Sequence, residues 1–247
     1  MDLSLAIWPP AGSTVSVATW LREMAALAEA FVAPPPFPED AARGEGEPVI
    51  VVPGFCSPDI STARLRQFLT RQGFAAEPWC GGANFGPKPA TLRAFERQLA
   101  ETAERRGRKV ALIGISLGGI LAREMAKHRP DCVACVITVV CPIHLPVTTP
   151  LAPLVHLAKR SWSDDARKRF AGLAEPPPVP LTAIVNPKDG VVDWQSCVPA
   201  PGDQVETVLI DGFHMAMASS PEAQRVIAAR LVGATPPSDN QRAVVAG

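Results

Sequence analysis

The chain lacks an excess of charge of either sign, because its 247 residues include 24 Lys and Arg and 24 Asp and Glu. A protein without net charge has no overall field that draws it to nucleic acid or to an anionic membrane surface. We therefore expect a partner that is small or neutral, and no nucleic-acid partner.

Long apolar runs are also missing, although 47% of the residues are hydrophobic. No run approaches the ~20 apolar residues that a membrane-spanning helix needs, so we expect no integral membrane segment. Residues 1–9 lack the basic segment and the apolar core of a secretory signal. These two absences predict a cytoplasmic location.

Phosphate-binding and metal-binding patterns are missing as well. The sequence contains neither a G-x-x-x-x-G-K-S loop nor a dinucleotide-binding fingerprint. Among its six cysteines, Cys132 and Cys135 have the C-x-x-C spacing of zinc or redox sites, but no second ligand pair accompanies them. We expect most cysteines to be buried thiols, and we predict no cofactor and no metal.

The chain length fits one large α/β domain, which buries about 70–75% of its surface on folding. From residue 49 onward, strand-like and helix-like segments alternate, which predicts a mostly parallel central sheet flanked by helices on both faces. Strands are expected at residues 49–52, 74–79, 110–113, 133–140, 181–185 and 205–210. Helices are expected at residues 15–33, 62–72, 90–106, 117–126 and 221–231.

This pattern divides the chain into three parts. Residues 1–47 hold a helix and a Pro-rich connector, residues 48–233 form the main α/β domain, and residues 234–247 are expected to be a flexible tail. No internal repeat is visible.

Residues 114–118 read G-I-S-L-G and lie between an apolar strand and a helix-like segment. This G-x-S-x-G spacing is typical of a nucleophile elbow, in which glycines let strand and helix pass close to a strained serine. The alternative is an ordinary helix N-terminus with flexible glycines, because the pentapeptide also arises by chance. The strand and helix context favours the elbow, with Ser116 exposing its hydroxyl above the sheet.

A serine hydroxyl is a weak nucleophile and needs a base that is held by a third group. Asp189 follows the strand expected at 181–185, and His214 follows the strand expected at 205–210. Asp189 and His214 are therefore expected beyond the carboxyl ends of these strands, as candidates for the acid and the base of a catalytic triad with Ser116.

With these motifs the chain resembles the α/β-hydrolase fold superfamily, in its lipase/esterase-like branch of serine hydrolases. The matching segments are V-I-V-V-P-G-F at 49–55, G-I-S-L-G-G at 114–119, K-D-G-V-V at 188–192 and G-F-H at 212–214. They span roughly residues 48–232, in the chain order that this fold requires.

The resemblance implies a role for each site residue. Ser116 would be the nucleophile, His214 the general base and then acid, and Asp189 the group that orients the imidazole. The backbone N–H groups of Leu117 and Phe55 would form the oxyanion hole. Relatives commonly have His-Gly where this chain has Pro-Gly at 53–54, a difference that affects loop rigidity more than chemistry, because the hole uses backbone groups only.

The resemblance also implies a short helical lid or cap at residues 142–180, whose first half is apolar and Pro-rich. The alternative is a pair of ordinary helices that bury their apolar side against the domain, since lid helices and core helices have the same periodicity of apolar residues. The Gly-rich loop at 79–87 is expected to border an acyl pocket.

Several other residues compete for these roles. Asp193 could be the acid if Asp189 only caps a helix, whereas Asp211 is expected to shape a turn. His128 fits the end of a helix, and neither His144 nor His156 follows the final strand, so none of the three is expected to be the base.

The sequence thus predicts a hydrolase of small hydrophobic carboxylic esters that works through an acyl-enzyme on Ser116. Acyl transfer or thioester hydrolysis by the same triad is the alternative, and cleavage of amides, lactones or polyesters stays open. A catalytically silent binding protein that keeps the fold is the alternative from outside the enzymes.

Overall fold

The computed structural model describes residues 15–144, 149–151, 157, 172–233 and 244–245. Their centre is a seven-stranded sheet in the order β2-β1-β3-β4-β5-β6-β7, in which every neighbouring pair is parallel. The strands are β1 (Pro48–Val52), β2 (Ala75–Pro78), β3 (Val110–Ile115), β4 (Val133–Val139), β5 (Leu181–Val185), β6 (Val205–Leu209) and β7 (Val244–Val245).

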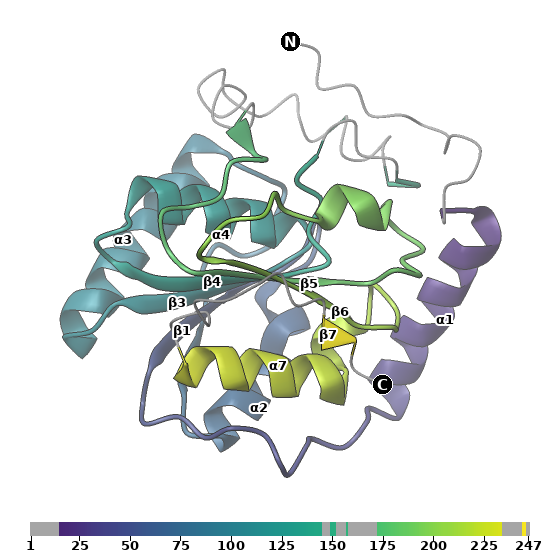
Figure 1. The fold of residues 1–247 in the computed structure, drawn as a ribbon, viewed down its shortest axis with the longest axis horizontal. Coiled ribbons are helices and arrows are strands. Elements are labelled where there is room, and N and C mark those ends of the chain that lie inside the picture. Colours follow the sequence, from purple (N-terminus) through teal and green to yellow (C-terminus); the bar gives the residue numbers. More distant parts are fainter. Residues whose placement is uncertain (1–14, 145–148, 152–156, 158–171, 234–243, 246–247) are drawn as a thin grey trace.

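Helices cover both faces of this sheet (Figure 1). The α-helices are α1 (Val17–Val32), α2 (Ala63–Arg71), α3 (Pro89–Arg106), α4 (Leu117–His128) and α7 (Pro221–Val232). Short 3-10 helices are η1 (Asp59–Thr62), η3 (Trp194–Cys197) and η4 (Met217–Ser219). α3 and α4 pack on one face and α2 and α7 on the other, whereas α1 lies at the edge of the molecule on the side of β6.

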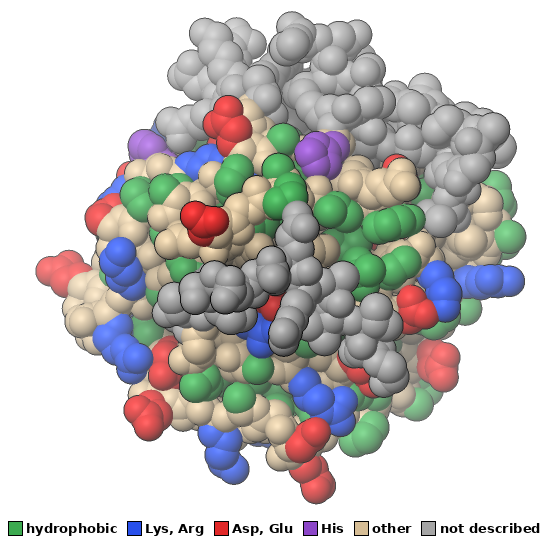
Figure 2. All heavy atoms as spheres, in the orientation of Figure 1, with side chains coloured by type: hydrophobic (Ala, Val, Ile, Leu, Met, Phe, Trp, Pro, Cys, Tyr) green, Lys and Arg blue, Asp and Glu red, His purple; other side chains and the backbone are tan. Residues whose placement is uncertain are grey.

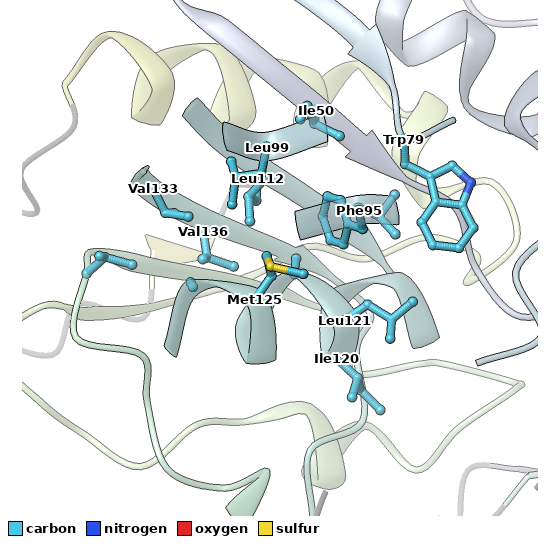
Figure 3. Packing of buried hydrophobic residues seen from close by; sticks show 14 of the residues in the cluster. Ile50, Trp79, Phe95, Leu99, Leu112, Ile120, Leu121, Met125, Val133 and Val136 are labelled. Atoms are coloured by element: carbon cyan, nitrogen blue, oxygen red, sulfur yellow. The ribbon is translucent and has the colours of Figure 1, made fainter. Parts of the chain in front are cut away.

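The central strands are apolar on both sides, so each contributes to two cores. In β1, Ile50 and Val52 pack with α3 and α4, while Val49 and Val51 pack with α2 and α7. Figure 3 shows the first of these cores, where Phe95 and other side chains of α3 and α4 meet the sheet. Fully burying one such side chain contributes about 1.5–3 kcal/mol, which is why strands buried on both faces dominate the centre of the fold.

Most charged side chains lie at the surface, and among the described residues Glu23, Arg123 and Asp189 are buried. Lys and Arg are interspersed with Asp and Glu over the face seen in Figure 2, in keeping with equal numbers of the two charges. Within the described part of the chain, no helix is long and apolar enough to cross a membrane.

The predicted mostly parallel sheet flanked by helices is confirmed, with differences at element boundaries. β3 continues to Ile115, two residues past its expected end, because Gly114 and Ile115 still pair with β4. The sequence does not predict β7, whose two residues pair with β6 inside the segment expected to be a tail. The lid expected at 142–180 lies mostly outside the described residues.

Candidate active site

Ser116 lies at the junction of β3 and α4 with φ 50° and ψ −120°, a strained combination for a residue with a side chain. The flanking glycines explain how the chain turns so sharply. A Cβ on Gly114 would lie 2.4 Å from the carbonyl oxygen of Gly118, and a Cβ on Gly118 would lie 2.3 Å from that of Val52. Only glycine lets β3, α4 and β1 approach this closely, as the predicted elbow requires.

Two backbone N–H groups border the elbow. That of Leu117 belongs to the first turn of α4, where amides have no partner within the helix and the helix dipole is positive. That of Phe55 follows β1 and has no hydrogen-bond acceptor among the described residues, whereas the next amide, Cys56 N–H, donates to Asn84 O at 2.8 Å. The Phe55 loop lies against the elbow, since a Cβ on Gly54 would be 3.6 Å from Cβ of Ser116.

Asp189 and His214 form a buried pair, with 2.7 Å between Oδ2 of the carboxylate and Nδ1 of the imidazole. The other carboxylate oxygen accepts hydrogen bonds from Val191 N–H at 2.8 Å and Val192 N–H at 2.9 Å. Asp189 therefore both caps its own turn and holds the imidazole, so the two roles considered for it from the sequence coexist.

Topology brings all three predicted residues to one edge of the sheet. Ser116 follows β3, Asp189 follows β5 and His214 follows β6, and these parallel strands end at matching register. The described hydrogen bonds do not include one between Ser116 and His214. Catalytic hydrogen bonds are often long in the absence of substrate, so this does not remove either residue from the site.

The competing acids lie elsewhere. Asp193 is the N-cap residue of η3, where its backbone oxygen accepts from Ser196, and it has no described contact with His214. Asp211 is exposed and forms an ion pair with Lys188, which links the loop after β5 to the loop after β6.

The remaining histidines are also accounted for where they are described. His128 ends α4 and faces Glu96, with 3.4 Å between Nε2 and the carboxylate. His144 Nε2 lies 2.8 Å from the carbonyl oxygen of Val198. His156 lies outside the described residues.

Two buried asparagines that the sequence reasoning missed hold the loops of the site. Asn84 donates from Nδ2 to Pro53 O at 2.7 Å, which joins the loop after β2 to the loop that carries Phe55. Asn186 donates to Gly212 O at 2.9 Å, which joins the loops of Asp189 and His214. Their only sequence signal is a position shortly after a strand, where an amide side chain can bond to loop backbone.

The described ends of the predicted lid are tied to the domain. On one side, Ile143 N–H donates to Ser196 O at 2.7 Å. On the other, Arg123 of α4 is 1% exposed and donates to the carbonyl oxygens of Leu173 and Glu175, both at 2.9 Å. Burial lowers the pKa of this guanidinium.

Four of the six cysteines are buried, as expected, and Cys56 and Cys80 are exposed. Burial raises the pKa of Cys197 well above its usual range, and the charge of nearby Asp189 adds to the effect. The thiol of Cys132 contacts Asp131 and Arg129. No cluster of potential metal ligands occurs within the described segments.

Comparisons with known proteins agree with this fold. Lipase B of Aspergillus fumigatus superposes with a TM-score of 0.59 and 18% identity, over 83% of this chain and 57% of that lipase. A monoacylglycerol lipase of Paleococcus ferrophilus has a TM-score of 0.52 and 17% identity, over 77% and 97% of the two chains. A pyrethroid hydrolase has a TM-score of 0.52 and 17% identity, over 75% and 97%.

At these identities the solved structures establish the fold alone, and no curated protein sequence matches the chain. A sequence profile described as "Alpha/beta hydrolase family" matches residues 49–244, which is most of the chain. The chain therefore belongs to the alpha/beta hydrolase family.

Proposed function

We propose that this protein is a serine hydrolase that cleaves small hydrophobic carboxylic esters through an acyl-enzyme on Ser116. The observation that carries the proposal is the buried Asp189–His214 hydrogen bond at the sheet edge that also holds the strained Ser116 elbow. A carboxylate on Nδ1 fixes the imidazole tautomer in which Nε2 can accept a proton.

In the acylation step, Oγ of Ser116 attacks the ester carbonyl carbon while His214 Nε2 takes the hydroxyl proton. The negative oxygen that forms is stabilised by N–H groups of Leu117 and Phe55, each a donor without a partner among the described residues. Removal of one such donor lowers kcat by a factor of about 10²–10³ in serine hydrolases.

The tetrahedral intermediate then expels the alcohol, which receives its proton from His214. Water attacks the resulting acyl-enzyme by the same route, with His214 again acting as base. The Asp189 side chain keeps its hydrogen bond to Nδ1 and stabilises the imidazolium in both steps.

An apolar substrate is supported by aromatic side chains beside the proposed oxyanion loop. Phe55 and Phe85 make an edge contact with ring centroids 6.4 Å apart, and Phe85 is 40% exposed. This pair would border one side of an acyl or alcohol group, in line with the expectation for the loop at 79–87. The names of the lipases and of the pyrethroid hydrolase with this fold agree with such a substrate.

The proposal is tested with p-nitrophenyl esters from acetate to palmitate, using the native protein, Ser116→Ala and a matched control, Ser61→Ala, in which an exposed serine of η1 is changed. We expect hydrolysis by the native protein and the control and none by Ser116→Ala, and the preferred chain length would measure the acyl pocket. Undiminished hydrolysis by Ser116→Ala would contradict the proposal.

A fluorophosphonate probe separates the alternatives if no ester is cleaved. Labelling of Ser116 in folded protein would favour acyl transfer or thioester hydrolysis by the same residues. Absence of labelling would favour a binding protein that keeps the fold.

A further inference from the structure

Glu23 is a buried carboxylate in a helix outside the α/β core. It belongs to α1, where it is 1% exposed, and Ala26 one turn later is also buried. No described Lys or Arg forms an ion pair with it. A buried carboxylate is costly unless hydrogen bonds compensate it, so its partners indicate what it does.

Its two oxygens bind the two loops that carry the proposed acid and base. Oε1 accepts from Gly190 N–H at 3.0 Å, and Oε2 accepts from Met215 N–H at 3.1 Å. Gly190 directly follows Asp189, and Met215 directly follows His214. A single planar group thus fixes the distance between the backbones of two catalytic loops that come from different strands.

The close approach of α1 depends on a glycine. A Cβ on Gly190 would lie 2.9 Å from both Thr19 O and Cγ of Glu23. Gly190 does not have a positive φ, so its backbone conformation does not demand glycine. Glycine is required by the lack of space, because any side chain at position 190 would push α1 away from the loop.

We propose that Glu23 is a positioning residue, which through Gly190 and Met215 holds Asp189 and His214 at hydrogen-bonding distance. This inference rests on the proposed function for its catalytic consequence. Charge-assisted bonds to backbone N–H groups are shorter and stronger than neutral ones, so one carboxylate can hold two loops. The N-terminal helix is then a part of the active site's framework without touching substrate.

The test compares Glu23→Gln with Glu29→Gln, a change at an exposed glutamate of the same helix. A carboxamide has only one oxygen, so Glu23→Gln can accept from one loop while its NH2 group faces the N–H of the other. We expect kcat to fall about 10- to 100-fold with KM changed little, as for misplacement of catalytic groups. Glu29→Gln should leave both constants unchanged.

A second readout does not depend on activity. We expect the proton between His214 Nδ1 and Asp189 to give a low-field signal in proton NMR, because the two atoms are 2.7 Å apart. This signal should shift or broaden in Glu23→Gln and stay unchanged in Glu29→Gln. Gly190→Ala, which displaces α1 while keeping the carboxylate, should change the signal in the same direction.

The two proposals fail in distinguishable ways. A Glu23→Gln protein that unfolds more easily but keeps the native kcat and the native NMR signal would show that Glu23 only attaches α1. The opposite pair of results is also informative. If Glu23→Gln lost the NMR signal while Ser116→Ala still hydrolysed esters, the positioning role would be supported and the proposed function would be overturned.

Discussion

At Ser116 the elbow concentrates strain on a single residue. A side chain at φ 50° and ψ −120° costs about 1–3 kcal/mol, and the fold retains it at the position proposed for the nucleophile. Removing Cβ removes most of that cost, whereas alanine keeps it. We expect the free energy of unfolding of Ser116→Gly, measured with urea, to exceed that of Ser116→Ala by about 1 kcal/mol, and we expect both variants to be inactive. Equal stability of the two variants would mean that the elbow is not strained.

Asp189 offers a sharper test of the acid assignment. In Asp189→Asn the amide NH2 group would face Nδ1 of His214, which favours the wrong imidazole tautomer. We expect kcat to fall by about 10³–10⁴ while the urea midpoint changes little. Asp193→Asn is the control, because that side chain is half-buried and has no described bond to the imidazole. If Asp193→Asn caused the larger loss, Asp189 would not be the acid.

Sequence reasoning finds some of these residues and misses others for a physical reason. Ser116, Asp189 and His214 each follow a recognisable strand, so local patterns identify them as candidates. Asn84 and Glu23 act on backbone groups 31 and 167 residues away. Nothing local in the sequence indicates such contacts, because they arise only when the elements pack.

The helices and strands follow the hydrophobic pattern of the sequence closely. The boundaries expected from the sequence are wrong where tertiary contacts determine the end of an element. The strand expected at 181–185 is β5 without change, since its five residues are all buried. β3 runs longer than expected because pairing with β4 overrides the tendency of Gly114 to end a strand. β7 is an edge strand of only two residues that pairs with β6, and it is too short for a sequence pattern to predict.

The junction of β1, β3 and α4 is the element most sensitive to substitution. In Gly118→Ala the new Cβ would meet Val52 O at 2.3 Å and Pro53 O at 2.5 Å, which forces α4 away from β1. We expect a loss of about 1–3 kcal/mol in free energy of unfolding and a lower kcat, because the N–H of Leu117 moves with the helix. Gly233→Ala is the control, since its nearest contact would be an ordinary 3.5 Å. Equal effects of the two changes would show that the junction is not tightly packed.

At the scale of the whole molecule, the parallel sheet sets how the site is assembled. The proposed catalytic groups lie at one edge of the sheet. Side-chain hydrogen bonds of Asn84 join the loops after β1 and β2, and those of Asn186 and Glu23 join the loops after β5 and β6. The same sheet also buries thiols that ionise readily in an unfolded chain. Burial raises the pKa of Cys135 in β4 and of Cys141 just after it from 9.0 to about 12.

This burial makes the fold sensitive to alkali. Well below pH 9 these thiols are protonated in both the folded and the unfolded state, and they do not affect the pH dependence of stability. As the pH rises from 9 toward 12, unfolded thiols lose protons that folded ones retain, so the free energy of unfolding falls by up to about 1.4 kcal/mol per pH unit for each thiol. Urea titrations under reducing conditions at several pH values measure this slope.

Two cysteine variants assign the slope to burial. We expect Cys135→Ala to reduce the slope of the free energy of unfolding against pH by the contribution of one thiol. The cavity left by the missing sulfur lowers stability at neutral pH but does not change this expectation. Cys56→Ala should keep the native slope, because that thiol is exposed and is not one of the thiols that the sheet buries. An unchanged slope in Cys135→Ala would mean that the β4 thiol already meets solvent in the folded protein, contrary to the double covering of the sheet by helices.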